Sequence, residues 1–65
     1  MNARQYLDKY GRAEAEKVAE AAGTNFAYFY QIAIGFRNPS PKMAKALQKA
    51  SKGKIKAAEL LGLAA

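Results

Sequence analysis

The sequence predicts an all-α fold, a compact bundle of about five short helices that forms one domain over residues 1–65. Apolar side chains recur at spacings of three and four residues, and no stretch shows the alternation of a strand. Alanine, leucine, lysine and glutamate, which all favour helix, dominate the composition. A domain of this length buries only roughly 60% of its unfolded surface. Since the chain has no cysteine, disulfides cannot add to its stability.

The first two predicted helices are separated by a glycine. The first runs from Asn2 to Tyr10, with Asn2 as its N-cap, and its inward face is Ala3, Tyr6, Leu7 and Tyr10. Gly11 ends this helix. The second helix starts near Arg12 or Ala13, and the glutamates of its first turn, Glu14 and Glu16, complement the positive end of the helix dipole.

A tight turn joins the second helix to the third. The second helix places Val18, Ala19 and Ala22 on one face, and the third, from Asn25 to Ile34, does the same with Phe29, Ile32 and Ala33. Gly23 falls where the second helix must stop, a position that usually needs a positive φ. Asn25 is the predicted N-cap of the third helix, with Thr24 as the alternative. Two short helices leaning together across such a turn are typical of a helix-turn-helix.

The residues of this motif resemble those of a known family. Ala19, Gly23, Phe29 and Ile32 match the small, glycine and apolar positions of the helix-turn-helix in phage Cro and CI repressors. The string GTNFAYFYQIAIGFRNPSP is similar to the small Cro-like and YdaS-like DNA-binding proteins of phages and prophages. The resemblance implies a lambda-repressor-like DNA-binding domain that binds double-stranded DNA as a homodimer, at least on DNA, and represses transcription by covering a promoter. By the same resemblance the start of the second helix lies near the DNA backbone, but Ala15 stands where the family often has Gln or Arg, so any contact there would come from backbone N–H groups, Arg12 or Lys17.

The third helix carries the candidate base-reading surface. Its outward side is rich in aromatic and aliphatic residues, which a solvated helix would not normally present. In a recognition helix, Asn or Gln pairs with adenine and apolar groups contact the thymine methyl. The predicted base-reading residues are Asn25, Phe26, Ala27, Tyr30 and Gln31. Two alternatives remain open: the helix is buried all round, with its tyrosine hydroxyls at the edge of the core, or the Phe26 ring folds back onto the core.

The loop after the third helix carries the candidate backbone contacts. Gly35 ends the helix, and Ser40 with Pro41 forms an N-cap and first-turn pair that starts the fourth. By the resemblance, this loop lies along the phosphate backbone. The predicted backbone-contacting residues are Tyr28, Arg37, Asn38 and Lys42. The alternative is that Arg37 is only a surface charge.

The rest of the chain is basic. Met43, Ala44, Leu47 and Ala50 form the apolar face of a fourth helix that Gly53 breaks, and Ile55, Ala58, Leu60, Leu61 and Leu63 predict a last short helix. The net charge is +6. Residues 1–32 balance four basic against four acidic side chains, whereas residues 33–65 set seven basic against one acidic. This asymmetry favours an anionic partner such as nucleic acid, although the lysines would also serve to solvate helix faces.

Other function classes are less well supported. Without histidine or cysteine, the usual nucleophile and base pair and the common transition-metal ligands are missing, so we expect no enzyme, no cofactor and no small-molecule substrate. The alternative function is a protein-interaction module such as a YdaS-like antitoxin. No run approaches the roughly 20 apolar residues of a membrane span, and no signal-peptide block opens the chain. We expect a cytoplasmic location, with the nucleoid of a bacterial host.

Overall fold

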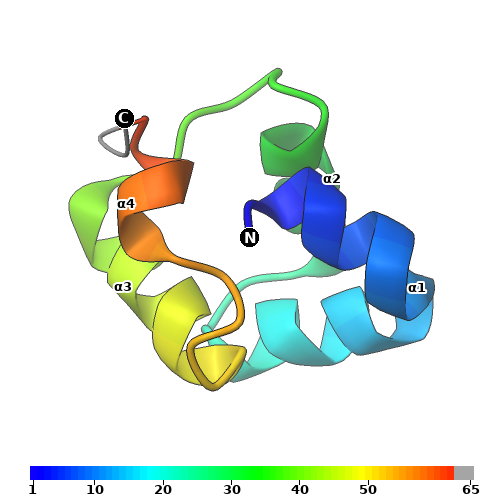
Figure 1. Ribbon diagram of the computed structural model, residues 1–65. Helices are drawn as coiled ribbons and strands as arrows, with labels where there is room; N and C mark the ends of the chain where they lie inside the picture. The colour runs from blue at the N-terminus through cyan, green and yellow to red at the C-terminus, as the bar shows by residue number, and fades with distance from the viewer. Residues whose placement is uncertain (63–65) are drawn as a thin grey trace.

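The computed structural model describes residues 1–62, which form four helices and no strand. These are α1 (Ala3–Ala21), α2 (Phe26–Ala33), α3 (Pro41–Ala50) and α4 (Ala57–Leu60) (Figure 1). The predicted all-α class is confirmed, but the number of helices is lower than the five expected. Leu63, which the sequence placed in the last helix, lies outside the described residues.

The difference in number arises at Gly11, because α1 contains both of the first two predicted helices. Gly11 has φ 87° and ψ 174°, which is not helical, and it kinks α1 into two arms, residues 3–10 and 12–21. One non-helical residue redirects the chain without a loop. The first arm is capped as predicted: Asn2 Oδ1 accepts a hydrogen bond from the Gln5 backbone N–H, and Gln5 Oε1 accepts one from the Asn2 N–H.

Gly11→Ala is expected to lower the free energy of unfolding by about 1–3 kcal/mol, since this positive-φ extended region is almost exclusive to glycine. A Cβ at Gly11 would meet no atom within 4 Å, so the loss comes from backbone conformation alone. Urea denaturation measures it. A synthetic chain with D-alanine at position 11 is the control, because the D-residue favours this φ and should retain full stability. Equal losses for both chains would indicate a steric cause instead.

The core lies where the arms of α1 close on α2 and α3. Phe29, Leu47 and Ile55 are its largest fully buried side chains, and the buried cluster comprises Ala3, Tyr6, Ala15, Val18, Ala19, Phe29, Ile32, Leu47 and Ile55. The inward faces predicted for the helices are confirmed, with Val18, Phe29 and Leu47 all buried. Ala19 is fully buried, and its small side chain allows α2 to pack closely against α1.

Burial also affects a tyrosine of this core. Desolvation raises the pKa of the Tyr6 hydroxyl above its ordinary value of 10.0, and the negative charge of Glu14 and the nearby Tyr10 add to the effect. The folded state therefore favours the neutral phenol. Its contribution to stability is complete below about pH 10 and is lost as the pH rises through the folded-state pKa. Urea denaturation at increasing pH should show this loss, and Tyr6→Phe should remove that part of the pH dependence. An unchanged pH profile in Tyr6→Phe would contradict the assignment.

The corner between α3 and α4 differs from the prediction. α3 ends at Ala50, and the chain leaves it through two successive residues with positive φ, Lys52 at 57° and the predicted breaker Gly53 at 83°. The buried Ser51 hydroxyl accepts a hydrogen bond from the Ile55 N–H at 2.9 Å and donates one to the Gln48 carbonyl at 3.0 Å. Ile55 is thus fixed in the core ahead of α4, which has only four residues, instead of forming the start of a longer helix.

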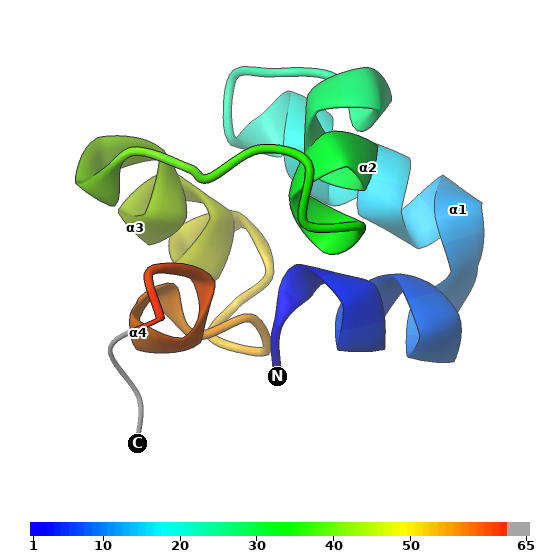
Figure 2. The same ribbon diagram turned by 90° about the horizontal axis from the view of Figure 1, so that it is seen from above.

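The chain ends and the α2–α3 connection complete the arrangement. Figure 2 shows the connection crossing from α2 to α3 as an extended segment, and the N-terminus beside the segment that leads into α4. There the Met1 α-amino group donates a hydrogen bond to the Lys54 carbonyl at 2.9 Å and lies 2.8 Å from Glu59 Oε2. The Lys56 N–H donates in turn to the Met1 carbonyl at 3.1 Å. These bonds hold the N-terminus against the segment that leads into α4.

Candidate nucleic-acid interface

Four residues, 22–25, connect α1 to α2. Gly23 has φ 90° as predicted, and its N–H donates to the Glu20 carbonyl, while the Thr24 N–H donates to the Ala19 carbonyl. Asn25 is the N-cap of α2, accepting the Tyr28 N–H on Oδ1 at 2.9 Å. Of the two candidate caps, Asn25 is therefore the correct one. The cap uses one lone pair of the Asn25 oxygen and fixes the side chain, whose amide N–H groups remain for an external partner.

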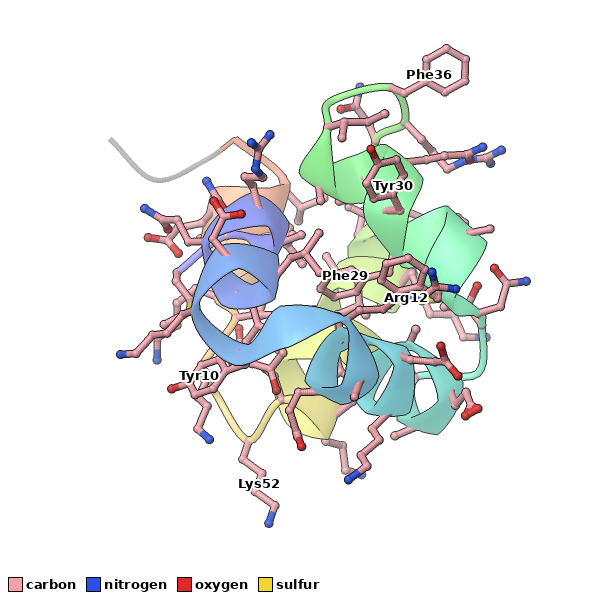
Figure 3. The ribbon with its side chains drawn as sticks, turned by 90° about the vertical axis from the view of Figure 1, so that its right-hand side faces the viewer. Tyr10, Arg12, Phe29, Tyr30, Phe36 and Lys52 are labelled. Carbon is pink, nitrogen blue, oxygen red and sulfur yellow. The ribbon has the colours of Figure 1, made fainter. Side chains whose placement is uncertain are left out.

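One side of α2 faces outward as a continuous stripe. We define the outward stripe as Ala27, Tyr30, Gln31 and Ile34, which lie three and four residues apart on a single face. Tyr30 and Ile34 are 46% and 48% exposed, whereas Phe29 and Ile32 on the other side are buried. The alternative of a helix buried all round is therefore wrong. In Figure 3 the Tyr30 ring lies on the side toward the viewer, with Arg12 below it and Phe36 above it.

Two arginines flank the outward stripe. The Arg12 guanidinium lies 4.6 Å from the centroid of the Phe26 ring, and the Arg37 guanidinium lies 5.2 Å from that of Tyr28. Residues two apart on a helix point to nearly opposite sides, since one turn takes about 3.6 residues. Phe26 and Tyr28 therefore carry the two guanidinium groups on opposite flanks of the stripe. We call Arg12 and Arg37 the flanking arginines.

The aromatic side chains beneath the flanking arginines belong partly to the core. Phe26 is half-buried, stacks on Phe29 with ring centroids 6.5 Å apart, and lies 6.0 Å from the Tyr30 ring. Tyr28 is likewise half-buried and packs against the core. The second alternative of the sequence analysis, a Phe26 ring folded back onto the core, therefore describes its packing. Base reading by Phe26 and backbone contact by Tyr28 remain predictions.

Gln31 and Arg37 contact each other directly. Arg37 Nε donates a hydrogen bond to Gln31 Oε1 at 2.8 Å, and the Arg37 backbone N–H donates to the Gln31 carbonyl at 3.2 Å. Gly35, with φ 82°, turns the chain after α2 and so returns Arg37 to the helix it has just left. The sequence assigned these two residues separate roles, and their pairing follows from that turn.

The remaining predicted backbone residues lie on the connection to α3. Asn38 and Lys42 are both exposed, while Pro39 between them is buried and fixes the segment to the body. Ser40 Oγ accepts the Met43 N–H at 3.1 Å, and Pro41 opens α3, both as predicted. Lys42 therefore lies in the first turn of α3, at the end of the connection that begins beside Arg37.

The basic second half of the chain is electrostatically uncompensated. Within residues 1–62, none of the ion pairs includes any basic residue after position 33, and Glu59 pairs with the Met1 α-amino group. Arg12 Nε lies 3.8 Å from Glu16 Oε2, an exposed pair that is weak by distance. The lysines are spread widely, however: in Figure 3 Lys52 lies at the end of the molecule opposite Phe36.

Arg12 was not among the predicted site residues, and only a contact with the DNA backbone was considered for it by resemblance. Its contact with Phe26 joins residues on the two helices that meet across the turn, and it depends on the direction in which Gly11 sends the second arm of α1. One feature of the sequence could have indicated this contact: Phe26 lies at the start of a helix, where its ring needs a neighbouring side chain to cover it.

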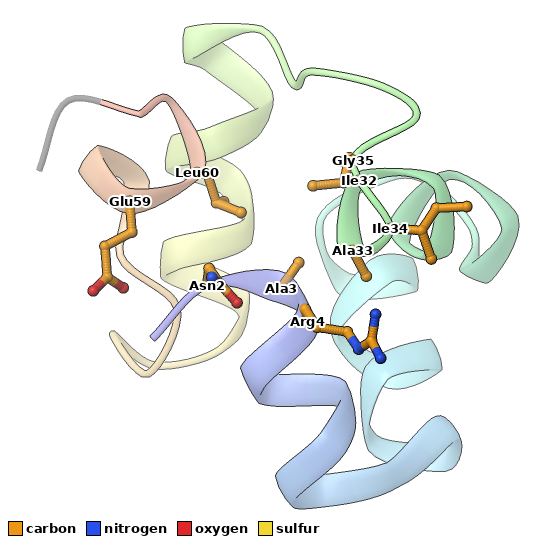
Figure 4. Close-up of a pocket in the computed structure, with 9 residues that line it drawn as sticks. All are labelled: Asn2, Ala3, Arg4, Ile32, Ala33, Ile34, Gly35, Glu59 and Leu60. Carbon is orange, nitrogen blue, oxygen red and sulfur yellow. The ribbon is translucent and has the colours of Figure 1, made fainter.

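A groove with a volume of about 280 Å³ lies between the start of α1, the end of α2 and the end of α4, and it meets the outward stripe only at Ile34 (Figure 4). Its polar side chains have structural partners: Asn2 caps α1, Arg4 pairs with Asp8, and Glu59 pairs with Met1. Among the described residues, no three potential metal-ligating side chains gather, and no helix has the length and apolar character needed to span a membrane.

Comparison with known proteins gives no match to a family model, a curated protein or a solved structure. Function is therefore inferred from the outward stripe and the residues around it.

Proposed function

We propose that the protein is a sequence-specific regulator that binds double-stranded DNA. The second arm of α1, the turn at residues 22–25 and α2 form its helix-turn-helix, and α2 is the recognition helix. The observation that carries this proposal is the outward stripe of uncharged side chains with a guanidinium group on each flank. The centre of the stripe is uncharged and suits base edges, whereas the flanking arginines are cationic and suit phosphates.

The major groove has a matching arrangement, with uncharged base edges in the centre and phosphates on both sides. It is about 12 Å wide, with base edges along its floor and phosphates along both walls. α2 has eight residues, so it is about 12 Å long and fits within the groove. With α2 in the groove, the stripe meets base edges while the flanking arginines meet phosphates of the two strands. A surface designed only for solvation would not place Tyr30 and Ile34 between two cations.

The side chains of the stripe suit base edges. Tyr30 offers a hydroxyl and Gln31 an amide, while Ala27 and Ile34 offer methyl groups that can contact thymine. Asn25 contributes its amide N–H groups from the start of the helix. Asn38 and Lys42 extend the phosphate contacts along the connection to α3, as the resemblance to Cro-like proteins implies.

A dimer on DNA is compatible with the size of the molecule. The Cα envelope measures 29 × 21 × 20 Å. Two copies on one face of the duplex, with half-sites about 34 Å apart, therefore stand side by side without overlap. Such a pair would cover a promoter against polymerase, which is the repression by occlusion that the resemblance implies.

A protein-interaction module, such as a YdaS-like antitoxin, is the second candidate. The observation in its favour is Phe36, which is 77% exposed and follows the exposed Ile34 by two residues. An apolar pair of this kind suits a protein partner as well as a thymine methyl. A protein partner, however, does not require a guanidinium group on both sides of the helix, so we place DNA first.

The test is selection of the purified protein on a randomised duplex library at near-physiological salt, followed by sequencing. We expect an enriched motif made of two inverted half-sites. Binding that lacks any motif and disappears with a modest rise in salt would contradict the proposal and leave the basic half as a nonspecific surface. The stripe with Phe36 would then be the place to seek a protein partner.

A further inference from the structure

We infer that Gln31 acts on DNA through Arg37: its side-chain oxygen fixes the guanidinium group so that the Nη groups bind one backbone phosphate. The inference rests on the proposed function and changes the role of one residue within it. The sequence assigned Gln31 to base reading, whereas the hydrogen bond from Arg37 assigns it to positioning.

Three contacts hold Arg37 in place. Its backbone N–H donates to the Gln31 carbonyl at 3.2 Å, its Nε donates to Gln31 Oε1 at 2.8 Å, and its guanidinium lies over the Tyr28 ring at 5.2 Å. A free arginine side chain must lose rotamer freedom when it binds an anion. Here the chain has already restricted that freedom, so a phosphate that meets Arg37 finds a preorganised donor.

The donors that remain are the ones a phosphate uses. Arginine has five N–H donors, and only the Nε–H is engaged by Gln31, which leaves the Nη groups for two parallel bonds to an anion. No ion pair within residues 1–62 includes Arg37, so its charge is uncompensated. Gln31 suits this role because it accepts a hydrogen bond without adding a negative charge. A glutamate there would hold Arg37 equally well but would cancel its attraction for phosphate.

The same bond limits what Gln31 can read. A bidentate pair with adenine requires the amide oxygen as acceptor and the amide NH₂ as donor. Arg37 Nε already donates to one lone pair of this oxygen, so the Gln31 amide is held in the orientation of that bond and would have to turn away from Arg37 to align both of its groups with adenine. A change at Gln31 should therefore weaken binding to every DNA sequence by a similar factor, instead of altering the preference at one base pair.

The experiment compares Gln31→Met, which keeps the length of the side chain but has no comparable acceptor, with Gln31→Glu and Arg37→Ala. Affinities are measured for the selected duplex, its single-base variants and a random duplex over a range of salt. Gln31→Met should weaken binding to all of them by roughly 2- to 10-fold, the effect of one hydrogen bond. Gln31→Glu should also flatten the salt dependence by about one phosphate contact. Arg37→Ala should cost less in the Gln31→Met background than in the original chain.

The matched control is Gln5→Met. Gln5 also accepts a hydrogen bond on its side-chain oxygen, but it does so from Asn2 in the cap of α1. This variant should keep full DNA affinity. Thermal unfolding followed by circular dichroism shows whether each variant folds. Nitrogen-15 NMR of the free protein gives a readout independent of DNA, because the Arg37 Nε–H should exchange slowly in the original chain and fast in Gln31→Met.

The outcomes separate this inference from the function on which it rests. If the original chain binds its motif but Gln31→Met alters preference at a single base pair and leaves random DNA unaffected, Gln31 reads a base and the inference is wrong. If Gln31→Met and Arg37→Ala both lose discrimination only at one G·C pair, the Nη groups bind guanine and the phosphate assignment is wrong. If the original chain binds no duplex at low salt, the proposed function fails and the inference fails with it.

Discussion

Replacing Phe29 with alanine is expected to lower the free energy of unfolding by about 3–5 kcal/mol. Phe29 is fully buried at the centre of the core, where it meets the edge of the Tyr6 ring at 6.3 Å and stacks on Phe26 at 6.5 Å. A chain of 65 residues holds roughly 3–10 kcal/mol of stability in total. The expected loss is therefore a large part of the free energy of unfolding, and a substantial fraction of the variant should be unfolded.

The measurement is urea denaturation followed by circular dichroism, and the chain provides a matched control. Phe36→Ala makes the same substitution at a residue that is 77% exposed. Its effect should stay within about 0.5 kcal/mol, as for surface positions without special contacts. Comparable losses for the two variants would mean that Phe36 also packs in solution, for example against a second copy of the chain.

The burial of Phe29 illustrates what a helical pattern of apolar residues predicts. The inward positions of each helix recur at the helical period, so Val18, Phe29 and Leu47 were assigned correctly without any knowledge of their neighbours. The caps at Asn2, Asn25 and Ser40 were also predictable, because each bonds to an N–H only three residues away. These are local interactions that the order of residues alone determines.

The errors concern residues whose conformation the helical pattern of apolar side chains does not determine. Ile55 was assigned to a helix for its apolar character, but its N–H bonds to the Ser51 hydroxyl and its side chain enters the core. Gly53, with φ 83°, was predicted to break the helix, but the positive φ begins one residue earlier at Lys52, and a lysine seldom adopts that conformation. The two arms of α1, by contrast, were predicted correctly as helices separated at Gly11.

The candidate site could be predicted in part, because some of its residues follow from the helical period alone. Ala27, Tyr30 and Gln31 follow from the helical period once the buried face is known. The flanking arginines do not, since Arg12 reaches Phe26 from the other helix and Arg37 reaches Gln31 through the turn at Gly35. Both contacts depend on how the elements fold back on each other. The surface that distinguishes a groove-binding helix from an ordinary one thus becomes visible only in three dimensions.

The second large effect is expected from removing both flanking arginines. Arg12→Ala with Arg37→Ala should weaken binding to the selected duplex and to random DNA alike, by roughly 100-fold at near-physiological salt, as for two lost charged hydrogen bonds. The reason is that phosphates carry no sequence information, while each neutralised phosphate contributes to affinity. The slope of log K against log salt should become shallower by about 1.8, or 0.9 for each lost contact.

The control removes the same charge from another part of the molecule. Lys49→Ala with Lys52→Gly lowers the net charge by two, as the arginine variant does, at the far end of α3. Glycine suits position 52, where φ is 57°, so the fold should be retained. If the flanking arginines bind the phosphates on both sides of the major groove, this control should keep most of the affinity and most of the salt dependence. Equal losses in both variants would mean that the chain binds through its total charge, and α2 would have no privileged place on the duplex.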